Sequence, residues 1–264
     1  MDKKLLALVL TTATVVIGLI LEPSGGSPSL TRYVISDVGE FLIILVAALI
    51  GFQWAKSFSF RSGLGKALFF ISLGLLAWGA GILAYFYYNI IMQIEVPYPS
   101  LADIGFLGII PLAAYGLFWL LKSIKITFDK KTILKVTALP LVSFLFTYWL
   151  FIQTKLAEDV SLIEKILNVA YPMGDVVFLS LGFVILSLIR GGNLFKPIAI
   201  ICAGFIIEAI ADFSFSWTTA TGTYYTGSFP DVLFALAFFT IGLGMYYTKH
   251  MAEIPAVPKK RDSK

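Results

Sequence analysis

Long apolar runs separated by short polar breaks dominate the chain. The runs cover residues 5–21, 34–55, 67–91, 101–122, 133–153, 165–189, 198–218 and 231–248. A helix of about 20 apolar residues, rising about 1.5 Å per residue, crosses the roughly 30 Å of bilayer hydrocarbon. The pattern therefore predicts an all-α, polytopic membrane protein with about eight transmembrane helices.

The breaks between runs are short and carry Gly, Pro or Ser, as in 22–29, 56–66 and 190–197. Because no linker is long enough to separate two domains, we expect a single transmembrane bundle over residues 1–250. Residues 251–264 are rich in proline and lysine, which predicts a short, basic, disordered cytoplasmic tail. The pattern Ser161-Leu-Ile-Glu164 is typical of a capping box and predicts a helix start near Leu162.

Composition excludes a soluble catalytic domain. Hydrophobic residues make up 58% of the chain and charged residues only 14%, whereas about a quarter of a soluble domain is charged. The net charge of +4 is explained better by membrane topology than by binding of nucleic acid. The one cysteine, Cys202, cannot form an internal disulfide.

The first run resembles a secretory signal peptide, because Lys3 and Lys4 precede it. The run is long for such a segment, and no small-x-small cleavage site precedes Glu22. We therefore expect an uncleaved first helix.

Basic residues predict the orientation. With the N-terminus in the cytoplasm, 17 of the 20 lysines and arginines lie inside, and only Arg32, Lys155 and Lys165 lie outside. Positive charge favours the cytoplasmic side. The bias predicts a cell-membrane protein with both termini in the cytoplasm.

An aspartate followed by an aliphatic residue marks each even-numbered run. These aspartates are Asp37, Asp103, Asp175 and Asp231, and the last three closely follow Tyr98-Pro99, Tyr171-Pro172 and Phe229-Pro230. Their spacing matches the length of a two-helix unit, which predicts four tandem helical hairpins as an internal repeat. All four aspartates then lie at the outer ends of the helices.

Two interpretations of these aspartates stay open. Aspartate is favoured in a first helical turn, where it meets free backbone N–H groups and the positive end of the helix dipole, and a duplicated cap would also repeat. Four carboxylates at one membrane face instead favour a ligand site.

Further acidic residues extend the candidate site. Glu40 lies one turn beyond Asp37, and Glu208 and Asp212 share one helix face. A charge near mid-membrane costs about 3 kcal/mol, so we expect Glu208 to be buried below the outer aspartates. Its partners would be polar side chains, water, a bound cation or a shared proton. The candidate ligand- or cation-binding residues are Asp37, Glu40, Asp103, Asp175, Glu208, Asp212 and Asp231. The metal is left open and no cofactor is predicted.

Aromatic residues gather near the predicted outer helix ends, as in 85–88, 148–149 and 213–217. Such residues concentrate at membrane interfaces, and we expect an interfacial belt rather than a ligand pocket. The only histidine, His250, lies in the predicted cytoplasmic tail. This position excludes Ser-His-Asp and HExxH sites within the bundle, so we expect a non-enzymatic protein.

Three stretches carry a resemblance to a known family: 98–112, Tyr171-Pro-Met-Gly-Asp175 and Gly227-Ser-Phe-Pro-Asp231. They resemble the polytopic N-terminal membrane region of some bacterial diguanylate cyclases and histidine kinases. The resemblance covers about residues 67–248 and implies a sensor, here without the output domain.

Two functions follow as hypotheses. The first is a sensor-like or partner-binding module in the lipid bilayer, with an acidic extracytoplasmic-facing site and a cytoplasmic or membrane signalling partner. The alternative is a proton- or cation-coupled small-molecule transporter in which Glu208 carries the coupling charge. A membrane enzyme that holds a metal on carboxylates comes third.

Overall fold

A computed structural model of the chain describes residues 2–22, 29–124, 129–153, 156, 159–189 and 191–252. Among these residues, eight helices are long and apolar enough to cross a membrane. The number of runs predicted from the sequence is therefore confirmed, and seven of the eight helices begin two to four residues before their predicted starts. The tail predicted for 251–264 lies outside the described residues beyond Ala252.

The helical elements follow one another with short connections. They are α1 (Lys3–Leu21), α2 (Leu30–Tyr33), η1 (Val34–Val38), α3 (Gly39–Ser57), α4 (Gly63–Phe86), η2 (Tyr87–Met92), α5 (Ala102–Lys122), α6 (Lys130–Thr147), η3 (Tyr148–Ile152), α8 (Leu162–Leu188), α9 (Phe195–Ala220) and α10 (Phe229–Ala252). The η elements are π-helical turns continuous with their neighbours.

Side-chain caps set several helix starts. Asp2, Ser62 and Asp129 accept hydrogen bonds from backbone N–H groups in the first turns of α1, α4 and α6. The capping box predicted at Ser161 and Glu164 is present and begins α8. Each cap satisfies N–H groups that have no partner within the helix.

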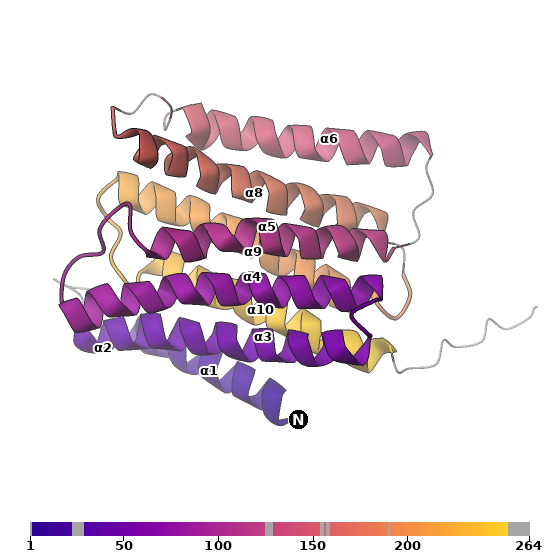
Figure 1. Cartoon of the computed structure of the whole chain (residues 1–264), viewed down its shortest axis with the longest axis horizontal. Coiled ribbons are helices and arrows are strands. Elements are labelled where there is room, and N and C mark those ends of the chain that lie inside the picture. The colour runs from indigo at the N-terminus through magenta and orange to yellow at the C-terminus, as the bar shows by residue number, and fades with distance from the viewer. Residues whose placement is uncertain are drawn as a thin grey trace, which may run out of the picture.

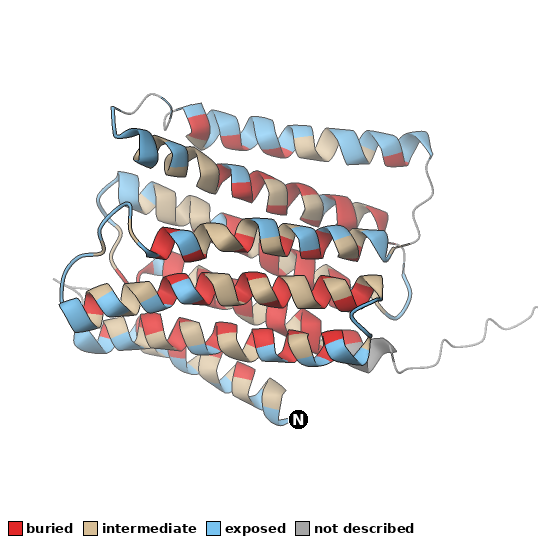
Figure 2. Cartoon of the chain, viewed as in Figure 1, coloured by how far each residue is buried: buried red, intermediate tan, exposed pale blue. Residues whose placement is uncertain are grey.

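Six helices form a closed ring, and two pack on its outside. Around the ring, α3 packs against α4, α4 against α5, α5 against α8, α8 against α9, α9 against α10, and α10 against α3. Helix α1 packs against α3 and α10, and α6 packs against α8 (Figure 1). Figure 2 shows buried residues concentrated in the ring helices, whereas α6 is mostly exposed.

Small residues allow close approach at two helix pairs of the ring. Gly116 of α5 meets the backbone of Ile71 and Ala67 on α4, and Gly244 of α10 meets the backbone of Ile201 and Pro197 on α9. The two glycines stand the same number of residues after Asp103 and Asp231. The α4–α5 and α9–α10 pairs therefore use equivalent contact positions.

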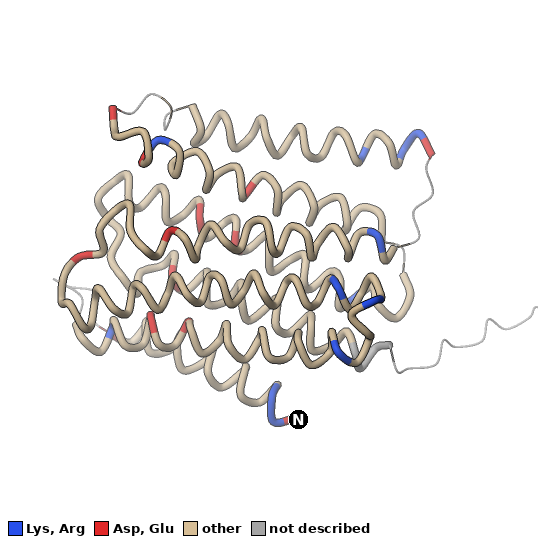
Figure 3. Tube along the Cα trace, in the orientation of Figure 1, with Lys and Arg blue, Asp and Glu red and all other residues tan. Residues whose placement is uncertain are grey.

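Charge is distributed unevenly along the bundle. Most acidic side chains lie toward one end of the helices and most basic side chains toward the other (Figure 3). We call the end with Asp37, Asp103 and Asp231 the acidic end, and the end with Lys56, Lys66 and Lys122 the basic end.

The α4–α5 contact generates a stability prediction. A Cβ added at Gly105 would stand 2.4 Å from the backbone nitrogen of Gly81 and 2.7 Å from the carbonyl oxygen of Ala77, so the helices must separate. Gly105→Ala is expected to destabilise the protein by about 1–3 kcal/mol. Unfolding in detergent micelles measures the effect.

Gly182→Ala is the matched control, because the nearest atom to its added Cβ lies 3.4 Å away. Alanine favours a helix interior by up to about 1 kcal/mol over glycine, so this variant should be neutral or slightly more stable. Equal stability of both variants would contradict the close contact.

Candidate functional site

A cavity of about 950 Å³ lies inside the ring at the acidic end, where all six ring helices line it. The loop segments 93–98 and 224–226 also contribute to its wall. Seven acidic residues line it: Asp37, Glu40, Glu95, Asp103, Glu164, Asp212 and Asp231. Five of the seven candidate residues therefore share one cavity.

Two π-helical turns meet at one side of the cavity. Asp37 lies in η1 and Asn89 in η2, and the Asn89 amide donates a hydrogen bond of 3.0 Å to the Asp37 carboxylate. Both side chains are buried. A π-helical turn often marks a functional site, because its extra residue changes which side chain faces inward.

Glu40 lies one turn deeper than Asp37 and is 4% exposed. The indole Nε1 of Trp78, on α4, donates a hydrogen bond of 2.9 Å to Glu40 Oε1. Trp78 also packs beside Phe106, Phe234 and Phe238. The Glu40 carboxyl group is thus held by a neutral donor within an aromatic wall.

Asp231 begins α10 and is held by three neutral donors. Its oxygens accept hydrogen bonds from the Gly227 backbone N–H, from Ser36 Oγ at 3.3 Å and from the Tyr224 hydroxyl at 3.3 Å. Burial raises the pKa of Tyr224 well above its ordinary value, and the nearby Asp231 carboxylate adds a smaller effect in the same direction. Tyr224 therefore stays a hydrogen-bond donor.

Arg32 supports the loop that carries Tyr224. The side chain is 2% exposed and donates to the carbonyl oxygen of Gly227 at 2.9 Å and to that of Glu22. Its guanidinium also lies over the ring of Tyr225. Arg32 belongs to the short helix α2 and thus links this helix to the loop between α9 and α10.

Asp103 lies in the first turn of α5. One oxygen of its carboxylate faces the start of this helix, and the other faces α8. Oδ2 accepts the Ser100 backbone N–H at 2.6 Å, and Oδ1 accepts the Tyr171 hydroxyl at 2.6 Å. Asp103 and Asp231 therefore lie at helix starts, each accepts a backbone N–H from just before its helix, and both line the cavity.

The capping interpretation does not apply to Asp37 and Asp175. Asp175 lies well inside α8, which begins at Leu162, and Asp37 lies inside the continuous helical segment from Leu30 to Ser57. The N–H groups near both residues already bond within the helix. The expected position at the outer end of a helix is wrong for Asp175, because the Ser161 capping box starts the helix several turns earlier.

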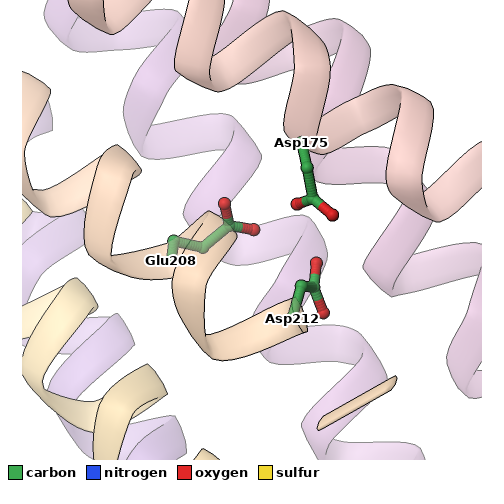
Figure 4. A group of neighbouring side chains, drawn as sticks. All are labelled: Asp175, Glu208 and Asp212. Atoms are coloured by element: carbon green, nitrogen blue, oxygen red, sulfur yellow. The ribbon is translucent and has the colours of Figure 1, made fainter. Parts of the chain in front are cut away.

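Three carboxyl groups gather below the cavity. Asp175 of α8 and Glu208 and Asp212 of α9 each bring one oxygen within 4.8 Å of the other two, and Figure 4 shows their carboxyl groups converging. We call these residues the carboxylate triad.

Glu208 is buried, as the sequence predicted. It is 1% exposed, and its Oε2 has no hydrogen-bond partner among the described residues. Asp212 lines the large cavity and Glu208 does not. The i, i+4 spacing predicted the pairing of Glu208 with Asp212, but nothing in the spacing placed Asp175 beside them.

Several polar partners were missed by the sequence analysis. Trp78, Asn89 and Tyr171 donate to the candidate carboxylates, and Tyr98 donates to Asn168 at 2.6 Å at the cavity wall. Tyr171 stands in the repeated aromatic–proline motif, which was a usable signal. Tyr85 and Phe215 line the cavity, while Trp149 and Trp217 are exposed at 70% and 67%. The aromatic residues therefore divide between cavity wall and surface.

Comparisons with known proteins find no matching family model, curated protein or solved structure. The resemblance to bacterial sensor regions accordingly stays a hypothesis, and the site must be interpreted from its own geometry.

The Glu40–Trp78 hydrogen bond generates a prediction. Trp78→Phe keeps an aromatic ring but removes the donor to a buried carboxyl oxygen, which costs about 1–3 kcal/mol when left unsatisfied. We expect a lower free energy of unfolding in detergent. Trp217→Phe is the control, because Trp217 is exposed and should tolerate the change. A Trp78→Phe protein as stable as the control would show that Glu40 does not depend on this donor.

Proposed function

We propose that the chain is a multi-pass protein of the cell membrane and that its ring cavity binds a small organic cation. In this proposal the cavity is the ligand site of a sensor-like, non-enzymatic module. One observation carries it: seven acidic residues line the cavity, and none of its described lining residues is Lys, Arg or His. A cavity with this charge attracts cations and repels anions.

Aromatic side chains add to the preference for an organic cation. Those lining the cavity include Trp78, Tyr85, Phe106, Tyr171, Phe215, Tyr224 and Phe234. Aromatic faces attract ammonium groups, and the attraction strengthens where water is excluded. The volume of about 950 Å³ matches sites for small molecules, which span about 300–1,000 Å³.

Neutral hydrogen-bond donors fix the positions of the cavity carboxylates before a ligand binds. Asn89, Trp78 and Tyr171 hold Asp37, Glu40 and Asp103 in place without neutralising them. A cation that enters meets fixed carboxylates, so little side-chain entropy is lost on binding.

The order of packing supports an internal repeat of two halves rather than of four equivalent hairpins, because α4 lies in the ring and α6 lies outside it. Helices α3, α4 and α5 follow one another around the ring as α8, α9 and α10 do, with α1 and α6 packed outside α3 and α8. We propose two related four-helix halves, each made of two of the predicted hairpins. Asp37 then corresponds to Asp175, and Asp103 to Asp231, so that the cavity lies between the halves.

The orientation follows from the positive-charge bias: the acidic end faces outside, and both termini are cytoplasmic. Single cysteines at Ser62 and Asn193 should react with a membrane-impermeant maleimide only after the membrane is permeabilised. Native Cys202 is buried, so the added thiol dominates the labelling. Labelling of either position in intact cells would overturn this orientation.

Choline and its neutral isostere 3,3-dimethylbutanol test the ligand class. Calorimetry on the purified chain should show choline binding at least about tenfold more tightly, a difference of about 1.4 kcal/mol. Asp37→Asn should weaken choline binding by a similar factor. Asp159→Asn is the matched control, because this exposed carboxylate at the acidic end does not line the cavity.

Equal binding of the two compounds, or an Asp37→Asn protein that binds choline normally, would contradict the proposal. The transporter alternative gives a different outcome, namely accumulation of choline in proteoliposomes against its gradient. A cytoplasmic or membrane signalling partner is proposed on the family resemblance alone.

A further inference from the structure

We propose that the carboxylate triad of Asp175, Glu208 and Asp212 binds one divalent metal cation of the calcium class below the ligand cavity. This site goes beyond binding of an organic cation, and it does not depend on that proposal.

The unpartnered oxygen of Glu208 points to a ligand. Glu208 is 1% exposed, Oε2 has no partner among the described residues, and the carboxyl group is directed toward Asp175 and Asp212 (Figure 4). Buried polar groups are nearly always satisfied, and an exception requires a reason. A cation shared by the three carboxyl groups would satisfy this oxygen.

A proton shared between Asp175 and Asp212 would not give Glu208 Oε2 a hydrogen-bond partner. The residues around the triad are Trp78, Phe106, Ile109, Ile110, Tyr171, Gly174 and Phe178, and none of them carries positive charge. The Tyr171 hydroxyl already donates to Asp103. Buried charges are normally paired or coordinate metals, and a metal cation held by all three carboxylates would supply the counter-charge.

The geometry can accommodate calcium. Three oxygens at the corners of a triangle with sides of 4.8 Å lie about 2.8 Å from its centre, and this is an upper limit for the triad. Calcium–oxygen distances are about 2.3–2.6 Å. The three carboxyl groups can therefore reach calcium with at most a small movement.

The surroundings favour the same ion. The void beside the triad has no volume for a water molecule, whereas magnesium usually keeps several waters and an octahedral shell. Calcium accepts irregular geometry and bidentate carboxylates, and three carboxylates supply up to six oxygens.

Asp212 provides the path to the site. Its side chain lines both the large cavity and the void beside the triad. A cation that enters the acidic cavity can therefore reach Asp212 first, and Asp175 and Glu208 then replace its remaining water.

Equilibrium binding of radioactive calcium to the full chain in detergent tests the site. Wild type should bind about one calcium per chain in the presence of excess sodium, and calcium should raise its unfolding temperature. Glu208→Gln should bind calcium at least tenfold more weakly while keeping its helical circular dichroism. Asp175→Asn is a second variant with the same expectation.

Asp103→Asn is the matched control, because Asp103 is an acidic residue of the cavity wall outside the triad; its calcium binding should equal that of wild type. Choline binding by Glu208→Gln should stay normal, which separates this proposal from the organic-cation site. The proposal is overturned if wild type binds no calcium, if magnesium or sodium displaces calcium at equal concentration, or if Glu208→Gln and Asp103→Asn bind calcium alike.

Discussion

The need to hold carboxyl groups inside an apolar ring governs this structure. Glu40, Asp37 and Asp231 are each buried, and the described residues around their cavity include no Lys, Arg or His. A buried carboxylate without compensation is strongly unfavourable. Each of these groups is therefore matched to neutral donors, chiefly indole, amide and hydroxyl groups, and the positions of those donors determine the shape of the acidic end.

The ring provides those positions. Close contacts at Gly105 and Gly116 bring α4 and α5 together. The packing of α4 against α3 places Trp78 opposite Glu40, and the packing of α5 against α8 lets Asp103 reach Tyr171. The π-helical turns η1 and η2 rotate Asp37 and Asn89 toward each other at the rim. Helices α1 and α6 add little to this network, because they pack outside the ring.

The sequence predicted the parts of this arrangement that depend on local pattern. Hydrophobic runs predicted eight helices, and residue types predicted the cap at Ser161 and the positions of Asp103 and Asp231 in first helical turns, because both depend on neighbours close in sequence. The i, i+4 spacing gave the Glu208–Asp212 pair. The order of helices around the ring could not be predicted, since every run is apolar on several faces. Consequently the partnership of Asp175 with Glu208 could not be predicted, nor could Trp78 as a partner of Glu40.

The carboxyl groups of the two halves that we propose have different surroundings. In one half, Glu40 of α3 receives a hydrogen bond from Trp78 of α4. In the other, the equivalent α8–α9 pair carries Glu208 at the position that corresponds to Trp78, and the aromatic Phe178 at the position that corresponds to Glu40. The α8–α9 pair therefore has no indole donor at this position, and Asp212 lies one turn after Glu208. Glu40 is held by a donor, whereas Glu208 Oε2 has no partner among the described residues, and this is where we propose that a cation binds. Asp212 lines both spaces, but Glu208 does not line the large cavity, so the proposed metal site adjoins the proposed ligand site without sharing Glu208 with it.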